Sequence, residues 1–571
     1  MLGRLRQLVE RSPSHDDATR LSRALVLLLV GLTLVIGAAI SDIYLHRGIE
    51  SGAEQPPVVQ STGRDLSLNA DLSGMPPDQL QSAATLLQNT GYRFVRQTFS
   101  WATIEPQRGT FDWDQSDRIV QTLSDHGIQV LAVLHLSPFW ARQAGQEGVL
   151  DAPPAADEDY AAFVGEFVGR YSKQIQFVQL WDRPNSAVQW GGEPARPEAY
   201  SKLLALAFNA SRSADSETKV VLAEMEPRGS GSAVGDDVQF IRELYALGAK
   251  PYFDILAARI DGGDLSPYDR SVGAERQNLS RAILFRELGV EHGDTAKPIW
   301  LTHFGWRAAE GSGVSVAEQS AFTVAGMERA RAEWPWTGLM FGWDLTPPAG
   351  GEESTGYALL DAGGSATPAF TALAALAASG VFGIAPTGFV PMDSPPVTYA
   401  GNWEDQHLNR RTFRTTSETG AATTIRFKGT GVVVFLRRSP DAGAIHVTID
   451  GGPISGRPVK DGAGVINLEF AQAGDVPVRL ADGLDDADHT VTLTLAEKGQ
   501  LTVGGVVVSR EPPLLWPVQV LVVIAVLAVV GALREMICVV ALRAGLLQRR
   551  RGVEFRPPLP TMPDWRPSGR Y

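Results

Sequence analysis

The sequence contains very little cysteine, with Cys538 as the single example among 571 residues. A disulfide needs two cysteines, so the chain forms no internal disulfide and must be stabilised by packing. No spacing of His and Cys predicts a zinc site, and no Gly-rich loop follows a strand as phosphate binding requires. We therefore expect neither a metal nor a cofactor.

Basic residues are outnumbered, with 51 Lys and Arg against 64 Asp and Glu and a net charge of −13. Nucleic-acid binding is driven by cations that displace phosphate counterions, so we expect no nucleic-acid partner. A hydrophobic content of 44% excludes a disordered tail or a collagen. At roughly 100–200 residues per domain, the chain has room for two or three domains.

Two long apolar runs, residues 24–45 and 514–533, predict transmembrane helices. The flanking ends, residues 1–23 and 534–571, carry net charges of +2 and +5, which leaves −20 for the rest. Positively charged flanks remain in the cytoplasm. We therefore expect a two-pass protein of the cell membrane with both termini cytoplasmic and the middle extracytoplasmic. A cleaved signal peptide is the alternative for the first run.

After a linker at residues 46–62, β-branched segments alternate with helical stretches such as Asp159 to Tyr171 and Ala317 to Glu333. This alternation is typical of parallel sheets covered by helices. Eight repeats over residues 63–380 predict an α/β fold, a closed (β/α)8 TIM barrel, whose functional loops follow the C-terminal ends of the strands. The expected strands lie near residues 64–69, 92–97, 128–135, 175–181, 219–225, 253–259, 298–303 and 337–343.

The pattern changes after a Pro- and Gly-bearing linker at residues 381–396. Residues 397–510 are rich in Thr, Val and Gly with alternating polarity, as in TTIRFKGTGVVVFLRR. Alternation without helical periodicity predicts an all-β sandwich.

Several motifs in the barrel region follow one another in a recognisable order. They include Arg96 on the second expected strand, the loop at 101–106, the turn at 109–113, SPFW at 137–140, and Trp343. These motifs resemble those of the retaining glycoside hydrolases of clan A, especially those near family 39. The resemblance continues through residues 180–190, 297–306 and 357–370, and it implies a barrel that acts on glycans. The sandwich is similar to sugar-binding jelly-roll modules.

Members of this clan carry the acid/base in a strand-four Trp-Asn-Glu-Pro motif and the nucleophile in a strand-seven Thr-Glu-Phe-Gly motif. Here residues 181–184 read WDRP and residues 302–305 read THFG, so Arg183 and His303 replace the two glutamates. Retaining hydrolysis needs two carboxyl groups about 5–5.5 Å apart. Arg183 keeps its proton and has no acceptor, and His303 offers no negative charge. No catalytic residue is intact.

Cationic residues gather at the expected strand ends, where Arg96, Arg183, Arg228, Arg259 and His303 converge on the barrel mouth. Guanidinium groups bind carboxylates and sulfates bidentately, so one hypothesis is a cleft that binds an anionic glycan, such as a uronic-acid polymer, without cutting it. The alternative is that the arginines form internal ion pairs. The available acids are Asp182, Glu224, Glu226, Asp254, Asp261 and Asp344.

Other residues are expected to contact a glycan at the same mouth. Aromatic rings near loop ends can stack on sugar faces, and polar side chains can bond sugar hydroxyls. The aromatic candidates are Trp101, Trp140, Trp306 and Trp343, and the polar candidates are His135, Asp182 and Asn185.

Three functions follow from this sequence. The first is a membrane-anchored, catalytically inactive barrel that binds cell-surface or extracellular polysaccharide, as an accessory of envelope or exopolysaccharide assembly with protein partners there. The second is an active O-glycosyl hydrolase that uses Asp182, Glu224, Glu226, Asp261 or Asp344. The third is a structural membrane subunit that binds protein partners, since fold alone does not fix function.

Overall fold

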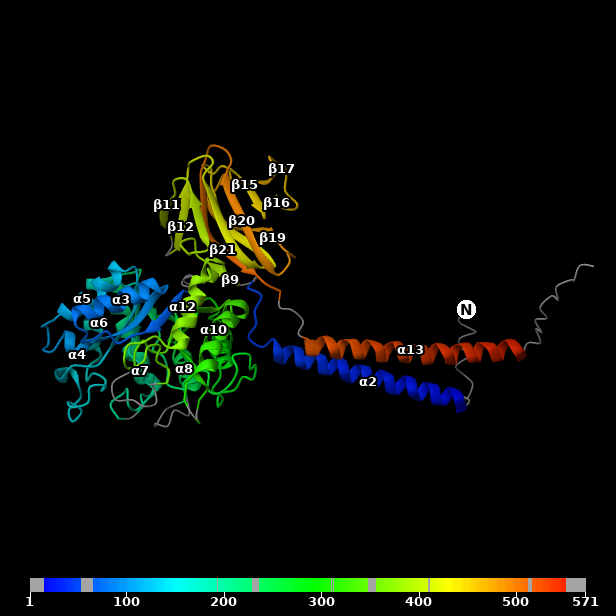
Figure 1. Ribbon diagram of the computed structural model, residues 1–571, viewed down its shortest axis with the longest axis horizontal. Coiled ribbons are helices and arrows are strands. Elements are labelled where there is room, and N and C mark those ends of the chain that lie inside the picture. Colours follow the sequence, from blue (N-terminus) through cyan, green and yellow to red (C-terminus); the bar gives the residue numbers. More distant parts are fainter. Residues whose placement is uncertain are drawn as a thin grey trace, which may run out of the picture. The chain divides into compact units, whose positions relative to one another are not determined.

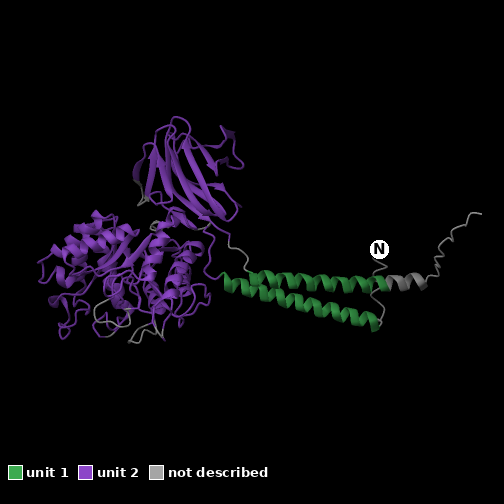
Figure 2. Ribbon diagram, viewed as in Figure 1, with its two compact units in different colours: residues 1–46, 513–571 green, residues 47–512 purple. Residues whose placement is uncertain are grey.

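A computed structural model describes residues 15–52, 65–192, 194–227, 236–309, 311, 313–347, 356–408, 411–511 and 516–550. The chain divides into two compact units, residues 1–46 with 513–571 and residues 47–512 (Figure 2). The first unit holds the two apolar helices, and the second holds the barrel and the sandwich (Figure 1).

The first unit is built from α2 (His15–Leu45) and α13 (Trp516–Arg550). Both helices are long and apolar enough to cross a membrane. They are longer than the predicted runs because polar turns extend each apolar segment. Arg20 of α2 pairs with Glu535 of α13 at 3.0 Å, so the two helices run antiparallel.

A seven-residue repeat of buried positions joins these helices. A Cβ added to Gly31 would lie 3.3 Å from Val529 Cγ2 and 3.5 Å from the Ala525 carbonyl oxygen. Small residues at this spacing allow close packing of membrane helices. The repeat comprises Asp17, Ala24, Gly31 and Ala38 on α2, and Val518, Ala525, Ala532 and Val539 on α13.

Eight parallel strands form the barrel in the order β5-β4-β3-β2-β1-β8-β7-β6. A parallel bridge between Val221 and Ile255 joins β5 to the start of β6 and closes the ring. All eight predicted strands are present, with shifted ends. Their bounds are β1 Leu66–Asn69, β2 Tyr92–Ser100, β3 Gln129–His135, β4 Phe177–Leu180, β5 Lys219–Val221, β6 Leu256–Asp261, β7 Ile299–Gly305 and β8 Thr337–Gly342.

Helices follow the strands and cover the barrel with their apolar faces. α10 begins with a capping box, in which Ser315 and Glu318 bond each other's backbone N–H groups. The helices are α3 Pro77–Asn89, α4 Trp101–Ile104, α5 Asp114–Asp125, α6 Asp157–Tyr171, α7 Pro197–Ala214, α8 Asp237–Ala246, α9 Ala282–Glu291, α10 Val316–Glu333 and α12 Pro368–Ala378. Short 3₁₀ turns lie at Phe139–Ala141, Lys250–Tyr252, Leu279–Arg281 and Val381–Gly383.

The barrel interior is apolar in its lower and middle layers. Trp300 of β7 fills the centre, and its ring occupies the place where a Cβ on Gly338 would stand, so β8 needs glycine there. Phe177 contacts this ring at 4.8 Å between centroids. The inner cluster comprises Phe94, Leu131, Phe177, Val221, Ile255, Ala257, Trp300, Leu339 and Phe341. The polar side chains of the barrel interior lie at the C-terminal ends of the strands.

The sandwich consists of two antiparallel sheets with alternating buried and exposed residues. The predicted linker at 381–396 is partly wrong. Residues 388–390 within it form the first strand of the sandwich, β9 (Gly388–Val390), because they pair with β21. One sheet contains β10 Val397–Ala400, β13 Ala422–Gly429, β15 Ala444–Ile449, β16 Gly452–Pro453, β17 Val459–Lys460, β18 Ala463–Asn467 and β20 Ala487–Leu495. The other contains β9, β11 Glu404–Leu408, β12 Arg411–Thr416, β14 Gly431–Arg438, β19 Gly474–Ala481 and β21 Leu501–Ser509.

Part of the predicted linker at 46–62 is fixed to the barrel. Arg47 donates both Nε and Nη2 to Glu287, and Arg286 does the same to Glu50. Gly48 has a φ of 78° and lies against Ile283. The segment 47–52 is thus held on α9, and residues 53–64 lie outside the described residues.

Candidate functional site

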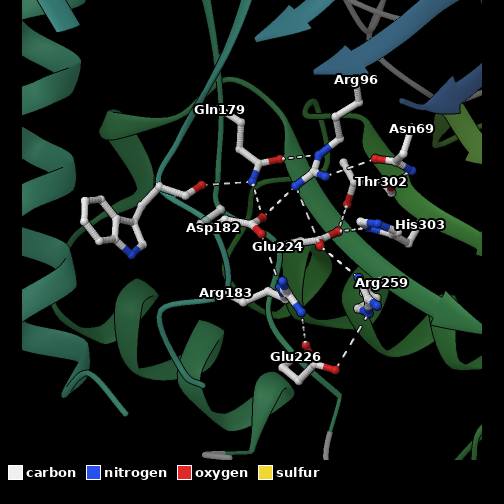
Figure 3. A network of polar contacts seen from close by, with 12 residues as sticks. Asn69, Arg96, Gln179, Asp182, Arg183, Glu224, Glu226, Arg259, Thr302 and His303 are labelled. Carbon is white, nitrogen blue, oxygen red and sulfur yellow. Dashed lines mark hydrogen bonds and ion pairs between the residues drawn. The ribbon is translucent and has the colours of Figure 1, made fainter. Parts of the chain in front are cut away.

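A connected polar network occupies the C-terminal ends of the barrel strands (Figure 3). Parallel strands direct these ends to one mouth of the barrel. The network brings together Arg96, Asp182, Arg183, Arg259 and His303, as the sequence predicts. It also includes Asn69 of β1, Gln179 of β4, Glu224 and Glu226 after β5, and Thr302 of β7.

Arg96 of β2 holds three strands together. Its Nη2 donates to Asp182 Oδ1 at 2.6 Å, its Nη1 to Asn69 Oδ1 at 3.0 Å, and its Nε to Gln179 Oε1 at 3.1 Å. The Glu224 carboxylate lies 3.7 Å from Nη2. Because every nitrogen of this buried guanidinium has a protein partner, little of its hydrogen-bonding capacity is left for a ligand.

Glu224, which follows β5, is the centre of the network and its side chain is 0% exposed. Its Oε2 accepts hydrogen bonds from Thr302 Oγ1 at 2.8 Å and from His303 Nδ1 at 2.7 Å, and its Oε1 accepts from Arg259 Nη1 at 3.2 Å. Burial alone would raise the pKa of Glu224, but the hydrogen bond from His303 and the charges of Arg96 and Arg259 hold it well below its usual range. The carboxylate therefore stays ionised.

His303 is the residue that the sequence resemblance aligns with the clan's nucleophile, and its side chain is 10% exposed. Burial lowers its pKa to about 4, despite the opposing charge of Glu224. The imidazole is thus neutral at pH 7. Since the ionised Glu224 can only accept, the single ring proton lies on Nδ1 and the Nε2 lone pair is left as an acceptor.

Arg183 is the residue that the sequence resemblance aligns with the clan's acid/base. Its Nε donates to Asp182 Oδ2 at 3.2 Å and its Nη1 to Glu226 Oε2 at 2.9 Å. The φ angles of Trp181 and Arg183 are 71° and 40°, in the left-handed region that favours glycine. Such backbone strain persists only where surrounding bonds over-determine it. The two ion pairs of Arg183 are among those bonds.

Arg259 of β6 links the network to an aromatic pair. Its guanidinium lies over the Trp343 ring at 4.5 Å, and Trp343 stacks on Tyr357 with centroids 4.0 Å apart. The Tyr357 hydroxyl donates to Asp261 Oδ2 at 2.6 Å. His303 also contacts the Trp343 ring, at 5.3 Å between centroids, so three neighbours surround Trp343, which is 6% exposed.

Asp344, which follows β8, is a carboxyl of a different kind. Among the described residues its side chain accepts no hydrogen bond, although its backbone carbonyl accepts from the Leu359 N–H. Burial raises the pKa of Asp344 to about 7, against the opposing effects of Arg259 and Arg96. It is the one network neighbour in the described ranges whose pKa the fold brings close to neutrality.

The three arginines face three carboxylates within 4 Å. Arg96 pairs with Asp182, Arg183 with Asp182 and Glu226, and Arg259 with Glu224. Glu226 also lies 3.8 Å from Arg259 Nε. This arrangement is the internal pairing that the sequence left open, and it neutralises the cationic cluster. Arg228 lies outside the described residues.

Three further predicted contacts lie away from any open surface. Trp101 and Trp306 are 0% and 1% exposed, with Nε1 donating to Glu105 and to the Leu265 carbonyl. Core packing leaves neither ring a free face for a sugar. Asn185 is also buried and clamps the backbone of Glu226, donating at 2.9 Å and accepting at 2.8 Å.

His135 and Trp140 differ in their exposure. His135, at the end of β3, is 3% exposed, and burial lowers its pKa to about 4. Its ring contacts Trp181 at 4.6 Å. Trp140 is half-buried, donates to the Glu105 carbonyl at 2.9 Å, and carries Arg108 over its ring at 4.7 Å. Trp140 is therefore the predicted tryptophan with the most exposed ring.

Sequence reasoning did not single out Asn69, Gln179 or Tyr357. Asn69 donates to the Thr302 and Gly342 carbonyls at 2.9 Å, and Gln179 donates to Asp182 at 3.0 Å. For Asn69 and Gln179 the available signal was a buried amide in a mostly apolar strand, which is costly unless its hydrogen bonds are made. No group of three or more His, Cys, Asp or Glu side chains in the described ranges is arranged to hold a metal.

Comparison with known proteins places this mouth in context. A family model described as "Beta-galactosidase" matches residues 73–135, from the loop before α3 to the end of β3. This match, the eight-stranded ring and the polar mouth together indicate the type of barrel. The barrel is glycoside-hydrolase-like. The match ends before Asp182, Arg183 and His303.

Beta-galactosidase Bga from Halorubrum lacusprofundi is 33% identical over 57 residues, which are 10% of this chain and 8% of that protein. The chain thus matches less than a tenth of the length of this relative. A family 39 glycoside hydrolase from Bacteroides cellulosilyticus WH2 has a TM-score of 0.47 and 16% identity over 77% of this chain and 83% of that one. A GH5_18 protein from Streptomyces cattleya has a TM-score of 0.43 and 14% identity, covering 55% of this chain and 80% of that one.

Proposed function

We propose that the protein is a membrane-anchored, extracytoplasmic glycan-binding protein that does not hydrolyse its ligand. In this role it serves as an accessory of envelope or exopolysaccharide assembly. One observation carries the proposal: Arg183 and His303 stand at the two positions where the resembled hydrolases have glutamates, and both are tied into one ion-paired network. The carboxylates of this network already bind arginines.

The chemistry of hydrolysis supports this reading. A retaining enzyme needs one carboxyl group to protonate the leaving oxygen and another to attack the anomeric carbon. Glu224 is fully buried, so it reaches no substrate without rearrangement of the mouth. Asp182 is ionised beside two arginines, which hold its pKa down although burial would raise it. A carboxylate that stays ionised is a poor proton donor.

The membrane assignment rests on α2 and α13. Their length, apolar composition and basic flanks support a two-pass anchor with both ends in the cytoplasm. The antiparallel pairing of the two helices supports the same topology, because it places residues 20 and 535 together. A second, all-β module next to the barrel is consistent with a protein that holds glycan outside the cell.

The test is a glycan array probed with the full-length protein in lipid nanodiscs, with hydrolysis of every retained glycan assayed in parallel. We expect retention without product. Arg183→Glu should abolish retention because it breaks the ion pairs of Arg183 with Asp182 and Glu226 and places a third carboxylate beside them. Arg170→Glu is the matched control, since Arg170 pairs with Asp117 at the surface of α6 and α5. Product release by the wild type would refute the proposal.

Asp344 favours one alternative, an O-glycosyl hydrolase with an unusual acid. A carboxyl group whose pKa is near 7 can donate a proton at neutral pH. If this is the activity, turnover of some glycan will fall by at least about a hundredfold in Asp344→Asn. Turnover that survives Asp344→Asn would exclude this role for Asp344.

A further inference from the structure

If the protein binds glycan, the ion pairs at the mouth indicate which class of glycan it accepts. An incoming carboxylate or sulfate would need a free guanidinium. Each arginine of the network instead has a carboxylate partner, at distances of 2.6 Å for Arg96, 2.9 Å for Arg183 and 3.2 Å for Arg259. Displacing one of these partners would leave a buried carboxylate unpaired, which is costly.

Further acids lie near this neutral network. Asp261 accepts from Tyr357, and Asp344 lies close enough to Arg259, Arg96, Arg183 and Glu224 to feel their charges. Among the described residues, the mouth therefore has no excess of positive charge to attract an anion. These acids would repel an anionic ligand, whereas an uncharged ligand is not repelled.

What the mouth does offer is hydrogen bonding of both kinds. His303 Nε2 is an acceptor, since Glu224 fixes the ring proton on Nδ1, and no hydrogen bond to Nε2 is made in the described part of the chain. In the same ranges, the Nη2 groups of Arg183 and Arg259 make no hydrogen bond and remain as donors. A hydroxyl both donates and accepts, so it matches this pair of functions.

We infer that the mouth binds an uncharged sugar residue, one hydroxyl of which donates a hydrogen bond to Nε2 of His303. Glu224 is the positioning residue, because it selects the tautomer that accepts. This inference rests on the proposed function and names the ligand class and the contact. Arg259 and Tyr357 already contact the Trp343 ring, so the sugar cannot stack on it. The sugar is therefore held by hydrogen bonds.

The test compares matched neutral and acidic oligosaccharides on the full-length protein in nanodiscs. The probes are β-1,4-mannan against β-1,4-mannuronan and β-1,4-glucan against β-1,4-glucuronan, with the neutral and uronic members of the array as the wider panel. We expect the neutral partner to be preferred. Its affinity should change little between low and high salt, because screening acts on charged ligands.

Variants then test the contact itself. His303→Gln should weaken neutral-glycan binding about tenfold, the effect of one lost hydrogen bond. His489→Gln is the matched control, since His489 makes the same kind of bond to Asp450, at 2.7 Å, in the sandwich. Glu224→Gln should also weaken binding, because an amide can donate to Nδ1 and so move the ring proton to Nε2.

The possible results distinguish a wrong ligand class, a wrong contact and a wrong function. Preference for the uronic partner, with affinity that falls as salt rises, would overturn the ligand class and leave the glycan-binding function in place. Unchanged binding by His303→Gln, with the fold intact by circular dichroism, would overturn the contact. Retention of no glycan at all would overturn the proposed function and this inference together.

Discussion

Asp344 gives the sharpest test of the electrostatics of the mouth. The perturbation is Asp344→Asn, which keeps the shape of the side chain and removes its ionisation. Burial raises the pKa of Asp344 from 3.8 to about 7 in the folded protein. A difference of this size corresponds to at most about 4 kcal/mol in the free energy of unfolding.

The direction of the effect follows from proton binding. Below about pH 4 the carboxyl is protonated in both the folded and unfolded chains, so it has no effect on stability. As pH rises towards 7 the unfolded chain loses this proton first, and the folded state is progressively destabilised. Above pH 7 the loss is complete. Asp344→Asn lacks this dependence, so its advantage over the wild type should grow between pH 4 and pH 7.

The assay is urea unfolding of the full-length protein in micelles, followed by tryptophan fluorescence at pH 4.5, 5.5, 6.5 and 7.5. The difference in free energy of unfolding between Asp344→Asn and the wild type should increase over this series. Asp264→Asn provides the control, since Asp264 is exposed in the loop after β6. Parallel curves for Asp344→Asn and the wild type would refute a buried, protonated carboxyl at the mouth.

Two glycine pairs test the packing of the two units. Gly31→Leu should separate α2 from α13, because a Cβ there already meets Val529 at 3.3 Å, while Gly37→Leu, with nothing within 4 Å, should not. Spin-label distances between the helices would report this, and equal distances in both variants would contradict the helix pairing. Gly48→Ala should lower the free energy of unfolding by about 2 kcal/mol more than Gly74→Ala. Both glycines have φ near 75°, but only Gly48 meets a neighbour, Ile283, so equal losses would contradict the docking of segment 47–52.

The arrangement of the barrel was predictable because buried parallel strands read as continuous β-branched runs. The eight strands were located to within a few residues, since each is flanked by helical periodicity. β9 was not predicted, because its three residues have no pattern of their own and are recruited by pairing with β21. Long-range pairing of this kind leaves no local signal.

The site was only partly predictable, for a different reason. The resemblance located Arg96, Arg183 and His303, yet the burial of Trp101 and Trp306 depends on packing that a single sequence does not specify. Glu224 was visible as a candidate acid, but its central place comes from three strands meeting around one carboxylate. Sequence spacing cannot give such a convergence.

The position of Glu224 also predicts that glutamates introduced at 183 and 303 would not produce hydrolysis. His303 Nδ1 lies 2.7 Å from the Glu224 carboxylate, so a glutamate at 303 would place a second carboxylate beside a fully buried one. A glutamate at 183 would likewise face Glu226, whose Oε2 now lies 2.9 Å from Arg183 Nη1. Like charges in a buried site cannot both ionise without a large cost.

We therefore expect the double variant Arg183→Glu/His303→Glu to be inactive and to unfold about 3–5 kcal/mol more easily than the wild type, the usual cost of breaking buried ion pairs. Adding Glu224→Gln should recover part of this loss, because it removes the competing charge. Urea unfolding and glycan hydrolysis, measured on the same three proteins, decide the matter. A double variant that is as stable as the wild type and hydrolyses a glycan would show that Glu224 does not prevent a glutamate at 303 from acting.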